Sequence, residues 1–171
     1  DGAAIDGTDG EALARLAEAA AAIHSHDAGD VRRFCPRPVN LDYFWRMVDG
    51  GMKPVRRWCA KLGCVGMAAL VRGLGDRAGT VANQALPLWQ TAPPTPVHGD
   101  LSLANSLTAG THVTLVDWEM FGLGDPALEV AYFLHDSRPL LPASALAAWR
   151  ERYLASSHDA RIGPRIGAYE K

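Results

Sequence analysis

A change of hydrophobic period near the middle of the chain constrains its fold more than any other feature. A run of prolines between residues 87 and 96 interrupts a helical pattern and predicts an extended entry into His98. Residues 105–108 and 112–116 then read as two short strands, and Ala109-Gly110-Thr111 between them predicts a hairpin. The sequence therefore predicts one small β element inside a largely helical chain.

Helical spacing accounts for most of the remaining sequence. Residues 10–24 combine this spacing with a strongly helix-forming composition. Asp125-Pro126 gives the clearest helix start, because Asp is a good cap and Pro suits the first helical position. A loop is expected over residues 28–40, followed by a short helix at about 40–48 with Asn40 as its cap and Asp49-Gly50-Gly51 as its terminator. Further helices are expected at about residues 54–72, 77–86, 125–134 and 142–155. The 171 residues suffice for one α+β, mainly helical domain with a sizeable core.

Composition and charge exclude several classes of partner. The formal net charge is −2, which gives no electrostatic reason to expect nucleic acid or an acidic membrane as a partner. No run of about 18 apolar residues is present, since Arg15 and Glu18 interrupt the Ala-rich stretch over 12–23. The first ten residues are acidic and Gly-rich, unlike a signal peptide, and lack an initiator Met. We expect a cytoplasmic chain, with no nucleic-acid partner and no membrane association, that begins partway through a gene product.

Two groups of potential metal ligands are better explained without a metal. Cys59 and Cys64 have no nearby His or second Cys pair to complete a zinc site, so reduced, buried thiols are favoured there and at Cys35. His24 and His26 lie near the end of the first predicted helix and would point apart. A solvated helix end is the favoured interpretation for this pair.

The residues around the predicted hairpin suit phosphoryl transfer. This reaction needs an acceptor hydroxyl held in line and the negative charge neutralised, mainly by Mg²⁺. Asp100 lies on a loop, where its carboxylate could bind a hydroxyl and accept its proton. Asn105 and Asp117 offer oxygen ligands of the kind that Mg²⁺ prefers. Gly99 permits a tight backbone, and His98 could anchor the loop.

The assembled pattern is far more specific than its parts. It runs from His98-Gly-Asp-Leu through Asn105 and a short hairpin to Val116-Asp-Trp-Glu, and then to Gly124-Asp-Pro-Ala at a helix start. This pattern resembles the aminoglycoside phosphotransferase and choline kinase-like family, which is related to the protein kinases. The resemblance is tight over residues 97–134 and looser over the flanking helices.

The resemblance implies a role for each matched residue. Asp100 matches the catalytic Asp, and His98 matches the histidine that supports the catalytic turn. Asn105 and Asp117 match the metal ligands, and the cofactors implied are ATP and Mg²⁺. The catalytic loop is expected over residues 97–107.

Four further positions complete the comparison with the family. Glu119 matches a supporting acidic position within a metal-binding segment over 115–126, and Asp125 matches a structural Asp that ties the next helix to the catalytic loop. Two residues depart from the pattern: Ser102 stands where His is frequent, and Glu129 stands where Asp is usual. Neither departure removes a catalytic group.

The small β lobe of a complete kinase is not recognisable upstream of His98. That lobe carries a Gly-rich loop, a strand Lys and a helix Glu, whereas the upstream lysines, Lys53 and Lys61, are not in a strand context. We expect a flexible segment over 1–9 and a kinase-like C-terminal lobe over 10–171, without the N-terminal lobe. The face left by that lobe is expected to allow association.

Two functional interpretations follow. The favoured one is an ATP-dependent O-phosphotransferase that acts on a hydroxyl of a small polar molecule, such as an aminoglycoside, another antibiotic, choline or a sugar. As an isolated lobe the chain is expected to be nearly inactive. The alternative is a non-catalytic, kinase-derived module that binds a ligand or a protein. The retained Asp100, Asn105 and Asp117 favour the enzyme.

Overall fold

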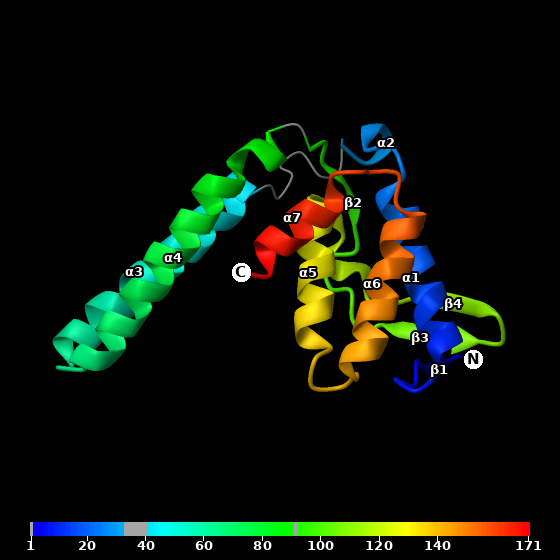
Figure 1. Cartoon of the computed structure of the whole chain (residues 1–171), viewed down its shortest axis with the longest axis horizontal. Coiled ribbons are helices and arrows are strands. Elements are labelled where there is room, and N and C mark those ends of the chain that lie inside the picture. Colours follow the sequence, from blue (N-terminus) through cyan, green and yellow to red (C-terminus); the bar gives the residue numbers. More distant parts are fainter. Residues whose placement is uncertain (1, 33–40, 91) are drawn as a thin grey trace.

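The computed structural model describes residues 2–32, 41–90 and 92–171, and it is mainly helical with two small sheets (Figure 1). The helices are α1 Gly10–His24, α2 Gly29–Arg32, α3 Leu41–Lys61, α4 Val65–Trp89, α5 Pro126–Asp136, α6 Ala143–Ser156 and α7 Ile162–Tyr169, with a 3₁₀ turn, η1, at Trp118–Met120. The strands are β1 Ala3–Ala4, β2 Thr95–Val97, β3 Ser106–Ala109, β4 His112–Leu115 and β5 Gly122–Gly124. No helix in this part of the chain is long and apolar enough to span a membrane.

The predicted hairpin is present and forms part of a three-stranded antiparallel sheet. Strands β3 and β4 pair with Ser106 opposite Leu115, and Gly110 turns between them with a φ of +60°. Strand β1 adds to the other edge of β3. It comes from the first nine residues, which also contribute the buried Ile5. The flexibility of this segment remains a prediction.

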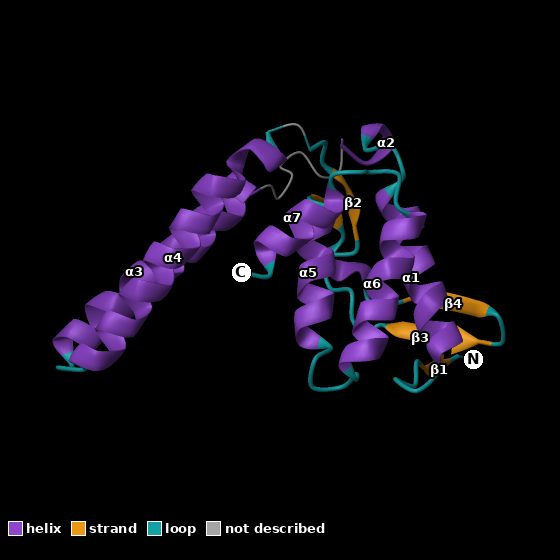
Figure 2. Ribbon diagram, in the orientation of Figure 1, coloured by secondary structure: helices purple, strands orange, loops and turns teal. Residues whose placement is uncertain are grey.

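Helices α1, α5, α6 and α7 pack around one apolar core (Figure 2). Helix α1 begins where predicted, since the Asp9 side chain accepts a hydrogen bond from the N–H of Ala12, 2.9 Å away. Its Leu and Ala residues lie against α6, where Trp149 stacks on Phe133 of α5 with ring centroids 4.3 Å apart. Burial of such aromatic side chains is a major source of core stability.

The region between residues 41 and 89 differs from the prediction. Three helices were expected, ended at Gly50-Gly51 and broken near residues 73–76, but α3 runs through Gly50, Gly51 and Pro54. Helix α4 likewise runs through Pro87, and the break falls instead at Gly63, whose φ is +69°. Because α3 and α4 pack side by side along their length, tertiary contact outweighs the weak local propensities. The proposed cap Asn40 lies outside the described residues.

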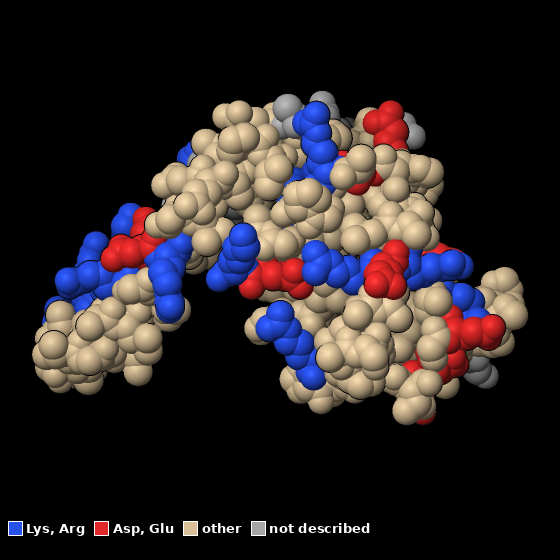
Figure 3. Space-filling view, in the orientation of Figure 1, with Lys and Arg blue, Asp and Glu red and all other residues tan. Residues whose placement is uncertain are grey.

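The α3–α4 pair forms a hairpin that projects away from the other helices (Figures 1 and 2). Lysine and arginine side chains gather on its visible face (Figure 3). Large apolar side chains are also exposed along it, at Val55, Trp58, Leu62, Val65, Met67, Leu70, Leu74 and Leu86. Cys64 is exposed and Cys59 is half-buried, so the expectation of buried thiols is wrong for Cys64; Cys35 lies outside the described residues.

Candidate active site

The loop that follows β2 is held against the segment that follows β4. Strand β2 pairs with β5, so that Val97 lies opposite Gly122 and the residues on either side of this pair meet. Gly99 has a φ of +88°, and a Cβ atom there would lie 2.1 Å from the carbonyl oxygen of Met120. Only glycine fits this position, because other residues disfavour this φ and their Cβ would overlap η1. The approach fixes His98 and Asp100 beside the end of the hairpin.

His98 is fully buried and anchors the loop through both ring nitrogens. Its Nε2 donates to the carbonyl oxygen of Val116 at 2.9 Å, and its Nδ1 accepts from the N–H of Asp100 at 3.3 Å. The ring also packs on Trp118, with centroids 4.4 Å apart. These two hydrogen bonds require the neutral tautomer with the proton on Nε2. His98 therefore holds the loop in place, and both of its ring nitrogens are used for this purpose.

Asn105 joins the catalytic loop to the hairpin. Its side-chain amide donates to the carboxylate of Asp100 at 2.8 Å and to the carbonyl oxygen of Asp100 at 3.0 Å. Its N–H donates to the hydroxyl of Ser102, so the serine that departs from the family pattern closes the turn. Its carbonyl oxygen accepts from the N–H of Val116 at 3.0 Å. Because both amide hydrogen bonds use the nitrogen, the Oδ1 atom remains available as an acceptor or a ligand.

Asp117 follows Val116 directly and adopts an unusual backbone conformation. Its φ and ψ are 63° and 60°, the left-handed region, and it is the sole described non-glycine residue with a positive φ. Such a conformation costs roughly 1–2 kcal/mol in a residue that carries a Cβ, and it is typical of functional sites. The Asp117 side chain is exposed, as is that of Glu119 on η1. Val116, the residue directly before Asp117, is hydrogen-bonded to both His98 and Asn105.

A cavity of about 430 Å³ opens beside Asp100, between the catalytic loop, β5 and α5. Four carboxylates contribute to its lining: Asp100, Asp125, Glu129 and Asp136. None of the described residues that line it is a lysine or an arginine. Its apolar walls come from Val97, Leu101, Met120, Leu123, Leu128 and Tyr132. The cavity suits a ligand with apolar surface and positive charge.

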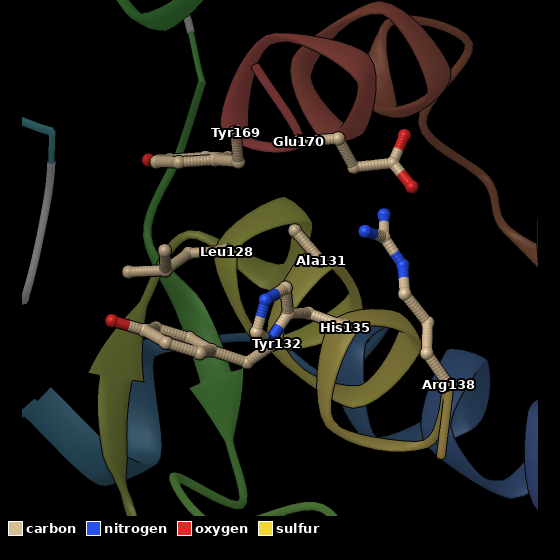
Figure 4. Close-up of a pocket in the computed structure, with 7 residues that line it drawn as sticks. All are labelled: Leu128, Ala131, Tyr132, His135, Arg138, Tyr169 and Glu170. Carbon is tan, nitrogen blue, oxygen red and sulfur yellow. The ribbon is translucent and has the colours of Figure 1, made fainter. Parts of the chain in front are cut away.

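A second hollow of about 200 Å³ lies farther along α5, and Leu128 and Tyr132 line both cavities. Figure 4 shows His135 and Tyr132 on α5 below it and Tyr169 on α7 above it. The side chains of Arg138 and Glu170 point toward each other across its far side (Figure 4). The two cavities are therefore neighbours along α5.

Asp125 and Glu129, both on or next to α5, have different tasks. Asp125 caps α5 through the N–H of Ala127 and accepts hydrogen bonds from Trp89 at 2.7 Å and from the buried Arg165 at 3.2 Å. It therefore connects α5 to α4 and α7. The connection from α5 to the catalytic loop, which the family pattern implied for Asp125, is made by Glu129.

Glu129 holds the backbone of the catalytic loop. Its carboxylate accepts from the N–H of Gly99 at 2.5 Å and from the N–H of His98 at 3.3 Å, and it lies 2.7 Å from Nε2 of His24. Burial by itself raises the pKa of Glu129, but the hydrogen bond and charge interaction with His24 and the two backbone donors outweigh it. The resulting pKa lies below its ordinary value. Glu129 is accordingly a carboxylate that acts only as an acceptor.

Comparisons with known proteins place the chain in a family and show which solved structures share its fold. A family model described as the phosphotransferase enzyme family matches residues 1–166. The chain belongs to this family. The comparison with curated protein sequences found no match.

Solved structures of related phosphotransferases share the fold. They include a choline/ethanolamine kinase family protein from Mesorhizobium loti, with 19% sequence identity, a TM-score of 0.66, and coverage of 99% of this chain and 53% of that chain. A macrolide 2′-phosphotransferase from Brachybacterium faecium has 17% sequence identity and a TM-score of 0.58, with coverage of 96% of this chain and 51% of that chain. A type I macrolide 2′-phosphotransferase has 19% identity and a TM-score of 0.54, with coverage of 95% of this chain and 50% of that chain. The chain thus spans about half the length of these structures.

One residue of the candidate site was misjudged from the sequence. His24 was expected at a solvated helix end, but it is buried and bonded to Glu129 and Tyr153. Its spacing from Leu13, Ala17 and Ala20 places it on the buried face of α1, and this signal was available in the sequence. His26, the second histidine of that pair, is exposed as expected.

Proposed function

We propose that this chain is the C-terminal lobe of an ATP-dependent O-phosphotransferase that acts on a small polar molecule, with Asp100 as the base. One observation carries the proposal: a continuous set of hydrogen bonds links Asp100 to Asn105, Asn105 to Val116, and Val116 to His98. This set gathers a loop carboxylate, an amide oxygen and the Asp117 segment in one place. Such an assembly is what transfer of a phosphoryl group to an alcohol requires.

Asp100 has a defined task in this reaction. Its carboxylate binds the acceptor hydroxyl and takes up the hydroxyl proton as the oxygen forms its bond to the γ-phosphorus of ATP. The bond from that phosphorus to the bridging oxygen breaks, and ADP leaves. The hydrogen bond from Asn105 to Asp100, 2.8 Å long, orients the carboxylate for this step.

The residues present fit a magnesium ion. Asn105 Oδ1 and the exposed carboxylate of Asp117 are hard oxygen donors, and the amide of Asn105 is already oriented by Asp100. Across the described residues, no group of three or more His, Cys, Asp or Glu side chains could hold a metal ion. Two protein oxygens, completed by phosphates and water, are the usual environment of Mg²⁺ in phosphoryl transfer. The ion would neutralise the charge on the phosphates.

The cavity beside Asp100 supports a cationic acceptor. Asp100 and Asp136 both line it, and none of its described lining residues carries a positive charge. A molecule with an amino group and a nearby hydroxyl would match this lining, with Leu123, Leu128 and Tyr132 contacting its apolar part. Aminoglycosides, other amine-bearing antibiotics and choline are candidates of this kind, and an uncharged sugar is a less suitable one.

Calorimetry on this chain tests the proposal directly. Mg·ATP should bind to the chain, and Asp117→Ala should abolish the binding while Glu151→Gln, on the exposed face of α6, leaves it unchanged. A panel containing an aminoglycoside, a macrolide, choline and a neutral sugar is then assayed for ADP release with a longer chain that includes the upstream lobe. Asp100→Asn should lower any rate by about 10²–10⁴-fold.

The outcomes separate the two functions. Acceptor-dependent ADP release that is lost in Asp100→Asn supports the phosphotransferase. Binding of a panel compound without ADP release, in a longer chain that binds Mg·ATP, would indicate the non-catalytic module instead. If a longer chain that includes the upstream lobe binds neither Mg·ATP nor any acceptor, the enzyme proposal is wrong.

A further inference from the structure

Three polar side chains meet inside the apolar core, behind the catalytic loop. His24 comes from α1, Glu129 from α5 and Tyr153 from α6, and all three are buried. Burial of a carboxylate is costly unless hydrogen bonds replace its lost hydration. The polar atoms of the three side chains must therefore form hydrogen bonds with one another or with nearby backbone groups.

The contacts among them form a directed chain. Tyr153 Oη lies 2.8 Å from Nδ1 of His24, and Nε2 of His24 lies 2.7 Å from Oε2 of Glu129. Because Glu129 is an acceptor only, Nε2 of His24 carries a proton, and Nδ1 forms the second hydrogen bond of the ring with the Tyr153 hydroxyl. Burial raises the pKa of Tyr153, so this hydroxyl keeps its proton. The His24 ring is held from both sides.

The far end of the chain of contacts is the backbone that precedes Asp100. The Glu129 carboxylate accepts the N–H groups of both His98 and Gly99. Both peptide units are therefore oriented by a side chain whose own orientation depends on His24. The side chain of His98 is fixed separately, at the carbonyl oxygen of Val116. The loop is thus pinned at its backbone and at its histidine ring.

We propose that His24 and Tyr153 are positioning residues, which set the geometry of Asp100 through the carboxylate of Glu129. The proposal rests on the phosphotransferase function proposed above. A base must lie within hydrogen-bond reach of the acceptor hydroxyl, and a displacement of about 1 Å lowers the rate by about 10²-fold. His24 lies far from Asp100 in the sequence and does not line the cavity beside it, yet it contacts the carboxylate that holds the two N–H groups preceding Asp100.

Nuclear magnetic resonance of the ¹⁵N-labelled chain tests the positioning step without any catalysis. The amide proton of Gly99, in a short hydrogen bond to a carboxylate, should resonate far downfield and exchange slowly with solvent. In His24→Ala this resonance should move upfield and exchange about tenfold faster or more. His24→Gln, whose amide can still donate to Glu129, should restore much of the signal. His26→Ala, an exposed histidine two residues away, is the matched control and should change nothing.

A kinetic measurement extends the test once an acceptor is known. His24→Ala should lower kcat by about 10²-fold with little change in KM for the acceptor, and His24→Gln should recover activity. Tyr153→Phe, which keeps the packing and removes only the hydroxyl, should shift the Gly99 resonance in the same direction by less; it carries the test if His24→Ala does not fold.

The readouts distinguish failure of this inference from failure of the proposed function. A folded His24→Ala or Tyr153→Phe protein with an unchanged Gly99 amide overturns the positioning role. A shifted Gly99 amide together with no turnover in the unsubstituted protein, for any acceptor tried in a longer chain, refutes the phosphotransferase proposal while the loop contact stands.

Discussion

Replacement of Gly99 by alanine tests the contact that brings the catalytic loop to η1. The new Cβ would lie 2.1 Å from the carbonyl oxygen of Met120, 2.6 Å from its carbonyl carbon and 2.7 Å from its Cβ. Real Cβ contacts are longer than about 3.0 Å, so the loop or η1 must move by about 1 Å. Two of these three atoms belong to the backbone, and no side-chain rotation removes that overlap.

The magnitude follows from two separate costs. A positive φ, here +88°, costs alanine roughly 1–2 kcal/mol, and overpacking of this kind costs roughly 1–3 kcal/mol more. We therefore expect Gly99→Ala to lower the free energy of unfolding by about 2–5 kcal/mol. The displacement should also lower any phosphotransferase rate by about 10²-fold, since Asp100 is the next residue.

Gly110→Ala is the matched control. Gly110 also has a positive φ, of +60°, but a Cβ there would meet nothing within 4 Å. It should cost only the conformational part, about 1–2 kcal/mol. Urea unfolding of both variants measures the difference in the free energy of unfolding. In thermal unfolding, each 1 kcal/mol corresponds to a Tm shift of about 2–4 °C for a domain of this size. Equal destabilisation of the two variants would refute the close approach of Gly99 to Met120.

Three further predictions each concern one residue, which either has a buried side chain or has a strained backbone. Because the pKa of Glu129 is lowered by folding, its contribution to stability should be complete above the ordinary carboxyl pKa of 4.5 and should disappear as the pH falls through the lower folded value. Urea unfolding from pH 7 to pH 3 should show this loss, and the loss should be smaller in Glu129→Gln, where only other carboxylates such as Asp159 contribute. A parallel pH dependence in both proteins would count against this role of Glu129. Arg165→Ala should destabilise the chain by about 3–5 kcal/mol, since it leaves the buried Asp125 without its cation. Thermal unfolding measures this loss. A change below about 1 kcal/mol would show that Trp89 and water suffice to compensate the charge of Asp125. Asp117→Gly should raise the free energy of unfolding by roughly 1 kcal/mol, because glycine adopts a positive φ without strain. The same substitution should abolish Mg·ATP binding in calorimetry. Unchanged binding would show that Asp117 is not a metal ligand.

The elements that the sequence predicted well are those with local causes. Asp125 and Pro126 specify a helix start through capping and a fixed φ, and α5 begins at Pro126 with the Asp125 carboxylate on the N–H of Ala127. The strand–turn–strand pattern around Gly110 gave the hairpin to within a residue or two. Asp100 and Asn105, predicted to lie together from their spacing, are joined by a hydrogen bond, and a shared site with Asp117 stays a prediction.

The elements that the sequence predicted poorly depend on partners distant in the chain. Gly50-Gly51 and Pro54 are local helix breakers, yet α3 continues through them because α4 packs along it. The sequence Gly122-Leu123-Gly124 has no local strand signal, yet it forms β5 because β2 supplies the pairing groups. Local propensities of about 1 kcal/mol or less per residue cannot resist such contacts.

The sequence by itself determined which chemical groups are available: an acidic loop residue, an amide and a second carboxylate at fixed spacing, and a helix capped by Asp125. These follow from bonds and periodicities that span a few residues. Only the tertiary structure decided what holds these groups in place. The contact of Glu129 with His24 joins residues 105 positions apart, and the approach of Gly99 to Met120 depends on the pairing of two three-residue strands. Both arise from packing of the whole core, which no local pattern encodes.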